Sequence, residues 1–422
     1  MSRPIDSPVS GIEETHGFLP RFSANGSSET CKSLAEAVDS CPDRSIDWDA
    51  LNVFFRVGTF IGGATPFKQI RKHSPPPLFV PHAHDMSRNQ ALEGYIQLFR
   101  EAVQNRARAG TIIGLSGGRD SRHILLELFR LGQLPDAVLS VDFQNENDAE
   151  IARQLCERIV LQQILVPIGR GAASARWTLK TCNLSSLEHL GFATMARRRD
   201  DRPLWDGVGG DVLSAGLFLE DWNLLLFREG KIDDLAERLV RTGNVSFFRD
   251  QSLFPRERAL EKLRTELMLH ASCANPVGSF YFWNRTRNNI GACAFALLRQ
   301  HGQQTLAPYL DANVYSLLAS LPAEFMLDHK FHDEAISMAF PDFRSVPYAK
   351  RRSITKATWL DTIHFMLAVA RGSLSSPFNS ELGLLLRAFQ SLLVPARRDD
   401  IDWIQKGAAY LAELGELANG GG

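Results

Sequence analysis

The chain has 422 residues, which is too long for one small core and predicts two or three structural units. Its 47 basic and 48 acidic residues give a formal net charge of −1, so no overall charge draws it to nucleic acid or to an anionic membrane. No stretch reaches the roughly 18 apolar residues of a membrane span, and the N-terminus lacks the apolar core of a signal peptide. The 6 cysteines include no Cys-x-x-Cys pair, which indicates reduced thiols in a cytoplasmic protein and argues against zinc.

The first hundred residues change character along their length. Residues 1–45 are rich in Ser, Pro, Gly and acidic residues, which predicts a loosely ordered lead-in. Apolar residues between 48 and 55 follow a short helical spacing. A longer helix is predicted over 87–108, with Ser87 as its N-cap and Gly110 after its end.

The next hundred residues alternate between strand and helix patterns. Strands are predicted at 111–115, 138–143 and 164–168, with helices at 121–131 and 148–159 between them. This order favours an α/β fold, a parallel sheet with flanking helices. Beyond about residue 215 the chain has mostly helical patterns, near 231–242, 256–270, 285–301, 312–321, 357–371 and 401–415.

The loop at 116–122 reads Ser-Gly-Gly-Arg-Asp-Ser-Arg and joins a predicted strand to a predicted helix. Paired glycines let backbone N–H groups approach an anion, and the start of a helix adds unpaired donors and a positive dipole end. An acid at Asp120 would repel a bare phosphate, so it indicates Mg²⁺ bridging carboxylate and pyrophosphate. The Gly-Lys-Ser/Thr ending of a Walker loop is absent. A generic Gly-Gly turn is the alternative, but Ser-Gly-Gly-x-Asp-Ser after an apolar strand is far more specific.

That hexapeptide is the signature of the PP-loop ATP pyrophosphatases, and four further segments resemble asparagine synthetases in the family's order. They are the helix ending at Ala102-Val103, Asn-Asp-Ala-Glu at 147–150, Asp-Gly-Val-Gly-Gly-Asp at 206–211 and Pro-Tyr-Leu-Asp at 308–311. The resemblance covers roughly residues 47–352. It implies a remnant of a glutaminase-like domain within 1–90. It also implies a synthetase-like domain over 91–422, with its α/β core at about 109–215.

The resemblance also implies the roles of individual residues. ATP would be held by Leu115, Ser116, Gly117, Gly118, Asp120, Ser121, Val141, Gly207 and Gly209. Asp120 and Asp211 would be the catalytic acids that hold magnesium; a turn acid after Gly-Gly is the plainer interpretation of Asp211. Lys350, in Lys-Arg-Arg at 350–352, would be a catalytic residue whose positive charge contacts the leaving pyrophosphate. Arg285 and Arg287 are a second basic pair, Lys330 is a weaker candidate, and a solvated face explains either basic cluster almost equally well.

The sequence departs from the family in two places. A complete glutaminase domain with an N-terminal cysteine is missing, since position 2 is Ser2, so we expect the amine to come from elsewhere. The family's glutamate, which assists amine attack, is replaced by Val208. Val212 and Leu306 likewise stand where an acid and an arginine are usual. The ATP half therefore matches the family, while the acceptor half differs.

The function expected from this resemblance is amide formation driven by ATP and Mg²⁺, with a carboxylate substrate and an amine; a partner protein is one source of the substrate or of ammonia. A lasso-peptide or β-lactam type cyclase would suit the altered acceptor half. Rivals are a PP-loop enzyme that modifies tRNA, and a degenerate paralogue that acts as a binding subunit. The general base is not identified, because a helical surface position explains Glu188 and His189 more simply.

Overall fold

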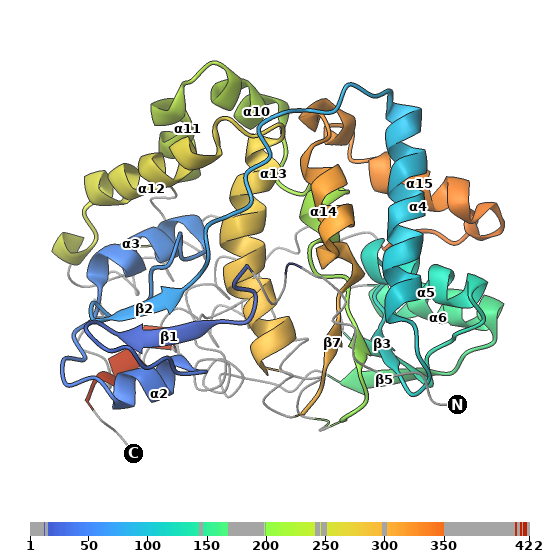
Figure 1. Cartoon of the computed structure of the whole chain (residues 1–422), viewed down its shortest axis with the longest axis horizontal. Coiled ribbons are helices and arrows are strands. Elements are labelled where there is room, and N and C mark those ends of the chain that lie inside the picture. Colours follow the sequence, from blue (N-terminus) through green and yellow to red (C-terminus); the bar gives the residue numbers. More distant parts are fainter. Residues whose placement is uncertain are drawn as a thin grey trace, which may run out of the picture.

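A parallel sheet of five strands forms the centre of one half of the molecule, so the predicted α/β architecture is confirmed (Figure 1). The computed structural model describes residues 12, 16–142, 147–167, 198, 200–240, 245, 251–297, 302–349, 410, 411, 414, 415 and 417–419. The strands lie in the order β5-β4-β3-β6-β7, and every neighbouring pair is parallel. Their bounds are β3 (Ile112–Gly114), β4 (Ala137–Asp142), β5 (Gln163–Pro167), β6 (Leu204–Trp205) and β7 (Thr305–Leu306).

The strand order places a topological switch between β3 and β6. From β3 the chain moves outward through β4 to β5, whereas β6 and β7 lie on the other side. Ligand sites of open parallel sheets lie at such a switch, outside the carboxyl ends of the strands. Strands β3 to β5 match their predictions within one or two residues. Sequence patterns missed β6 and β7 because two residues carry no periodic signal.

Three helices follow or precede these strands: α4 (Arg88–Arg106), α5 (Asp120–Arg130) and α6 (Asp148–Ile159). As predicted, Ser87 caps α4, and it forms a capping box with Gln90. Helix α4 ends at Arg106, two residues before the predicted end. The predicted range of α6 is matched at both ends.

The remainder of the described chain is mostly helical, as predicted. Its elements are α9 (Gly210–Leu213), α10 (Asp221–Arg228), α11 (Ile232–Leu239), η1 (Gln251–Leu253), α12 (Arg256–His270), α13 (Pro276–Tyr281), η2 (Phe282–Ile290), η3 (Ala292–Leu297), η4 (Pro308–Leu310), α14 (Ala312–Ala319), η5 (Ala323–Met326), α15 (Phe331–Ala339) and η6 (Pro341–Phe343). The helix expected at 285–301 begins earlier and has two π-helical segments, η2 and η3. The helix expected at 357–371 lies outside the described residues, as does much of the one expected at 401–415.

A smaller unit, which we call the N-terminal unit (residues 16–73), stands beside the sheet in Figure 1. It comprises β1 (Arg21–Ala24), α2 (Leu34–Asp39), α3 (Trp48–Val57) and β2 (Ile70–His73), with β1 and β2 antiparallel. The expected loosely ordered lead-in is therefore wrong for residues 16–45, where Phe22 and Leu34 are fully buried. A few strongly apolar side chains among polar ones suffice to anchor this segment.

The N-terminal unit has its own hydrophobic core, which includes the other end of the chain. Phe54 stacks on Phe60 with ring centroids 4.6 Å apart and lies 5.4 Å from the ring of Tyr410. Leu411 and Leu414 are buried in the same cluster. Both ends of the chain thus contribute to one core. The division of the chain at residue 90 stays a prediction.

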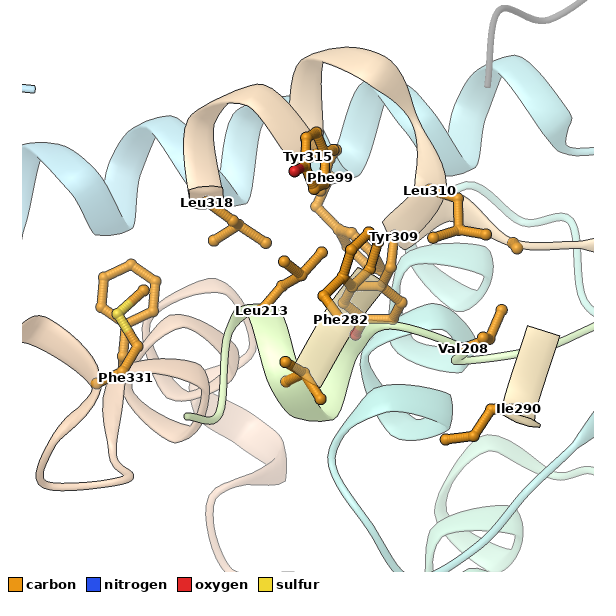
Figure 2. Packing of buried hydrophobic residues seen from close by; sticks show 14 of the residues in the cluster. Phe99, Val208, Leu213, Phe282, Ile290, Tyr309, Leu310, Tyr315, Leu318 and Phe331 are labelled. Atoms are coloured by element: carbon orange, nitrogen blue, oxygen red, sulfur yellow. The ribbon is translucent and has the colours of Figure 1, made fainter. Parts of the chain in front are cut away.

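The main core joins the sheet to the helices. Figure 2 shows side chains that converge from several elements, among them Phe99 of α4, Leu213 of α9, Phe282 of η2 and Leu318 of α14. Burial of such side chains contributes roughly 1.5–3 kcal/mol each. Within the described residues, no helix has both the length and the apolar character that crossing a bilayer demands.

The packing of the chain's two ends can be tested at Leu414, which is fully buried. We expect Leu414→Ala to lower the free energy of unfolding by about 2–5 kcal/mol, because it leaves a cavity in the hydrophobic core of the N-terminal unit. Urea unfolding measures the change, and Leu417→Ala, at a half-buried position of the same segment, should have a smaller effect. A loss below about 0.5 kcal/mol for Leu414→Ala would contradict this packing.

Candidate active site

The loop at 115–119 leaves β3 at the topological switch and leads directly into α5. Its start is tied to the neighbouring strand, since Leu115 N–H donates to the Leu139 carbonyl at 2.8 Å and Ser140 Oγ donates to the Leu115 carbonyl at 2.8 Å. Ser116 N–H donates to Ser121 Oγ at 3.2 Å, and Gly118 N–H donates to Ser116 Oγ at 3.2 Å. The two serines thus hold the loop in a tight curve.

Helix α5 begins without a side-chain cap at Arg119. Its first-turn N–H groups are therefore available to an anion, and the positive end of the helix dipole lies at the same place. Gly117 N–H is used differently from the expectation, because it donates to Asp148 Oδ1 at 3.0 Å. Anion binding would depend on the helix start and the two hydroxyls more than on that N–H.

A second loop, at 206–211, leaves β6 beside the first. Strands β3 and β6 are paired in parallel through Ile112 with Leu204 and Ile113 with Trp205, so both loops start at the same edge. Glycines let them touch: a Cβ on Gly207 would lie 2.5 Å from Asp120 Cβ, and one on Gly210 would lie 2.6 Å from Asp120 Oδ1. Any larger residue would push the loops apart.

Three carboxyl groups converge where the two loops meet: Asp120, Asp206 and Asp211. Burial and, to a smaller extent, the charge of Asp120 raise the pKa of Asp211 to about 6, while Arg285 opposes the shift. Burial also raises the pKa of Asp206 to about 7, against the hydrogen bond that Val208 N–H donates to Asp206 Oδ1 at 2.8 Å. Mutual repulsion of this kind is relieved when a cation binds.

Sequence reasoning identified Asp120 and Asp211 but missed Asp206. The available signal was its place directly after a buried strand, but that strand is only two residues long. The structure brings the three acids near one another. The sequence could not predict this, because the acids belong to two loops that lie far apart along the chain.

The acids fit a magnesium ion that also takes ligands from phosphate. Asp120 Oδ1 is buried and accepts no hydrogen bond; His332 Nδ1 lies 3.3 Å away without the geometry of one. An orphaned carboxylate oxygen beside a second acid suits a hard cation. Among the described residues no group of three or more His, Cys, Asp or Glu side chains is placed to hold a metal by itself. Mg²⁺ characteristically completes its shell with phosphate and water oxygens.

A buried polar network lies behind Asp120. Its centre is His332, whose partners are Ser214 Oγ at 3.0 Å from Nδ1, and Tyr95 OH, Tyr309 OH and His123 Nδ1, each at 3.2 Å from Nε2. Burial lowers the pKa of His123 and raises that of Tyr309, which keeps both groups neutral. Tyr309 OH also donates to the Asp120 carbonyl at 3.2 Å. The network fixes the backbone and side chain of Asp120 from the side away from solvent.

The segment at 346–349 braces the first loop. Ala349 N–H donates to the Gly117 carbonyl at 2.9 Å, and the Arg122 guanidinium donates to the Val346 carbonyl at 2.9 Å and lies 4.1 Å from the Tyr348 ring centroid. Arg119 forms a two-pronged ion pair with Asp333. Lys350 follows this segment directly but lies outside the described residues, as do Arg351 and Arg352.

The two arginines of η2 have different surroundings. Arg285 NH1 lies 3.8 Å from Asp211 Oδ2, with its guanidinium 4.8 Å from the Phe218 ring centroid. Arg287 instead donates to the carbonyls of Trp283 and Pro75, each at 2.9 Å. Arg285 therefore belongs to the site, and Arg287 supports the fold. Lys330, the weaker candidate, precedes α15 as an exposed residue.

The remaining candidates lie at the carboxyl ends of adjacent strands. Leu115 follows β3, Val141 lies near the end of β4, and Gly207 follows β6, so the three share one edge of the sheet. Gly209 has φ +94°, and a Cβ there would lie 3.2 Å from Leu310 and Phe282. Val208 is 4% exposed and Figure 2 places it near Leu310 and Ile290. Glu188 and His189 lie outside the described residues.

Comparisons with known proteins add little to this geometry. No protein-family model matches the chain, and neither does any curated protein. A solved structure, NMN synthetase from Francisella tularensis, is similar over 47% of this chain and 93% of its own, with 16% sequence identity and a TM-score of 0.24. A similarity that weak carries no functional argument, so the site has to be judged on its own residues.

The raised pKa of Asp206 predicts that the free energy of unfolding depends on pH. The pKa of Asp206 rises from 3.8 to about 7 on folding, so the native state holds its proton more tightly and loses stability as pH rises through that value. We expect Asp206→Asn to raise the free energy of unfolding by roughly 1–2 kcal/mol at pH 8, with the gain fading toward pH 4. Urea unfolding from pH 4 to 8 without magnesium measures it, and a gain independent of pH would contradict the buried acid.

Proposed function

We propose that the chain is an ATP-dependent amide-forming ligase, which adenylates a substrate carboxylate, releases pyrophosphate and transfers the acyl group to an amine. The observation that supports this most is the meeting of Asp120 and Asp211 above the uncapped start of α5. Two acids beside an anion-binding helix start suit a magnesium-bound phosphate chain better than a substrate without phosphate. The resemblance of the loop at 116–121 to the PP-loop signature points the same way.

In this proposal Ser116, Ser121 and the first turn of α5 would bind the β- and γ-phosphates. Asp120 and Asp211 would hold Mg²⁺, which supplies Lewis-acid stabilisation of the leaving pyrophosphate. The two glycine loops, which touch at Asp120, would orient the α-phosphorus toward the substrate carboxylate. These preorganised donors and charges stabilise the transition state more than the ground state.

The proposed basic residues are Arg285 and Lys350. Pyrophosphate leaves with high charge density, so a nearby positive charge would stabilise it. Arg285 lies beside Asp211, and its side chain is 15% exposed. Ala349 N–H donates to the Gly117 carbonyl, and Lys350 is the next residue in the sequence. We propose both as contacts of the phosphate chain.

The acceptor side of the site supports an amine other than ammonia. Val208 is buried among apolar side chains at the position where the resembled family carries a glutamate, so it moves no proton. An intramolecular cyclase of lasso-peptide or β-lactam type is the form of the proposal that this residue favours. In such an enzyme the amine belongs to the substrate, and the base can come from another group.

The main prediction concerns Asp120. We expect Asp120→Ala to abolish carboxylate-dependent exchange of labelled pyrophosphate into ATP, a loss of at least about a thousandfold, because the change removes a magnesium ligand. Asp136→Ala is the matched control, since Asp136 is a half-exposed acid just before β4, at the amino-terminal edge of the sheet. Both variants should retain the wild-type circular dichroism spectrum.

Exchange that persists in Asp120→Ala would overturn this proposal. If wild-type protein offered a broad set of acids made ADP, adenylation would be excluded. If it made no nucleotide product at all, the degenerate-paralogue alternative would be favoured. A tRNA-modifying activity would appear as nucleoside-dependent exchange.

Arg285 gives a second prediction. We expect Arg285→Ala to slow exchange by about a hundredfold, since one charged donor to the leaving group is lost. Arg285→Lys should recover part of the rate, because it keeps the charge without the planar donor pair. Equal rates for wild type and Arg285→Ala at saturating ATP would remove Arg285 from the mechanism.

A further inference from the structure

The π-helix η2 carries an unusual set of buried polar residues. A π-helix pairs residues five apart and is rare except as short segments, frequently at functional sites. Within η2 every one of the following is buried: Asn284, Thr286, Arg287, Asn288 and Asn289. Buried amides destabilise a fold unless they are hydrogen-bonded, so their partners decide whether this helix form is held.

Each of the three asparagines has a hydrogen-bond partner in the N-terminal unit, at residues 58–62, while Asn284 Nδ2 also donates to Glu266 and to the Phe280 carbonyl. Gly62 N–H donates to Asn284 Oδ1 at 2.9 Å. Asn288 Nδ2 donates to the Phe60 carbonyl at 2.9 Å, and Asn289 Nδ2 donates to the Gly58 carbonyl at 3.2 Å. Thr59 Oγ1 lies 3.2 Å from Asn289 Oδ1, as donor to it. One short loop thus contacts three asparagines of the helix.

A buried lysine completes this contact. Lys72 of β2 is 4% exposed, and its Nζ donates to Asn288 Oδ1 at 2.6 Å. Burial holds the pKa of Lys72 well below its ordinary value, and the charge of Arg287 adds to this. Asn288 is therefore held from both ends of its amide. We call residues 58–62, Lys72 and the three asparagines the amide lock.

The same helix carries Arg285, next to Asn284, and points it to the active site. Its guanidinium lies between Asp211 Oδ2, at 3.8 Å, and the Phe218 ring, at 4.8 Å. Phe218 has φ +69°, a strained value for a bulky residue, and stacks on Tyr281 at 4.3 Å. Two independent features, the helix register and a strained aromatic platform, thus determine where the guanidinium lies.

The register matters because residues advance less around a π-helix axis than around an α-helix. A return of η2 to α-helical geometry would rotate Arg285 relative to the asparagines and carry its guanidinium away from Asp211. If the amide lock were only structural, it would stabilise the fold without determining the orientation of Arg285.

We propose that Lys72 and the loop at 58–62 are positioning residues for the active site: they hold η2 in its π-helical register and so keep Arg285 beside Asp211, ready for the phosphate chain of a nucleoside triphosphate. The inference deepens the proposed function and depends on it for the identity of the ligand. It gives the N-terminal unit a task that needs no glutaminase chemistry. The active site is then incomplete without this unit.

The direct test uses Lys72→Met in the full-length protein without nucleotide. We expect phenylglyoxal modification of Arg285 to speed up at least about fivefold and amide hydrogen exchange at 282–290 to speed up about tenfold, because an opening of that size needs only about 1.4 kcal/mol. Peptide mass spectrometry reads both. Lys68→Met is the matched control, since Lys68 is an exposed lysine four residues earlier in the chain. Unchanged exchange at 282–290 in folded Lys72→Met protein would overturn the inference.

A milder variant keeps the test decisive if Lys72→Met does not fold. Thr59→Val preserves shape and removes one donor to Asn289, so it should give the same changes at 282–290 to a smaller degree. Unchanged exchange at 282–290 in folded Thr59→Val protein would then exclude positioning by the lock.

Pyrophosphate exchange then separates this inference from the proposed function. We expect Lys72→Met to lower kcat about tenfold with little change in the KM for ATP, and to cause no further loss in an Arg285→Ala background, because its effect passes through Arg285. Additive losses in the double variant would overturn positioning while leaving the ligase proposal standing. Absence of exchange in wild-type protein would sink the ligase proposal, whereas the nucleotide-free labelling would still decide whether the lock holds Arg285.

Discussion

The parallel pairing of β3 with β6 is the constraint on which the site depends. Because the two strands run side by side in the same direction, the loops after Gly114 and Trp205 must emerge at one edge and face each other. Glycines at 207 and 210 let the second loop touch Asp120, and the three acids then share one small volume. Burial raises the pKa values of Asp206 and Asp211, and the proximity of the acids to one another adds to both shifts.

The surroundings of the acids are arranged to resist their repulsion. Behind Asp120, His332 and two tyrosines form a buried hydrogen-bonded network that packs against this residue. On the other side, Arg285 opposes the repulsion at Asp211. The segment at 346–349 and the ion pair between Arg119 and Asp333 hold the first loop in place. These contacts restrain the acids, which is what the proposed electrostatic stabilisation of a leaving group requires.

The N-terminal unit is part of this arrangement. It shares a core with residues near the end of the chain, and it contacts the π-helix that carries Arg285 through a set of paired amides. The loop at 58–62 supplies carbonyls to the asparagines of this helix, and β2 supplies the buried amine of Lys72. Loss of the unit would therefore affect both the stability of the fold and the geometry of the site.

The sequence by itself determined the α/β class, three strands of the sheet, helices α4 to α6 and the loop at 116–121, because these depend on local periodicity, capping and glycine placement. Asp120 and Asp211 could be singled out for the same reason. Only the tertiary structure decided that Asp206 joins them, that Arg285 faces the acids while Arg287 does not, and that residues 16–45 fold. Strands of two residues leave no periodic pattern, and the direction of an arginine on a π-helix depends on partners more than two hundred residues away, such as the donors and carbonyls at 58–62. Such contacts are set by long-range packing, which no local pattern encodes.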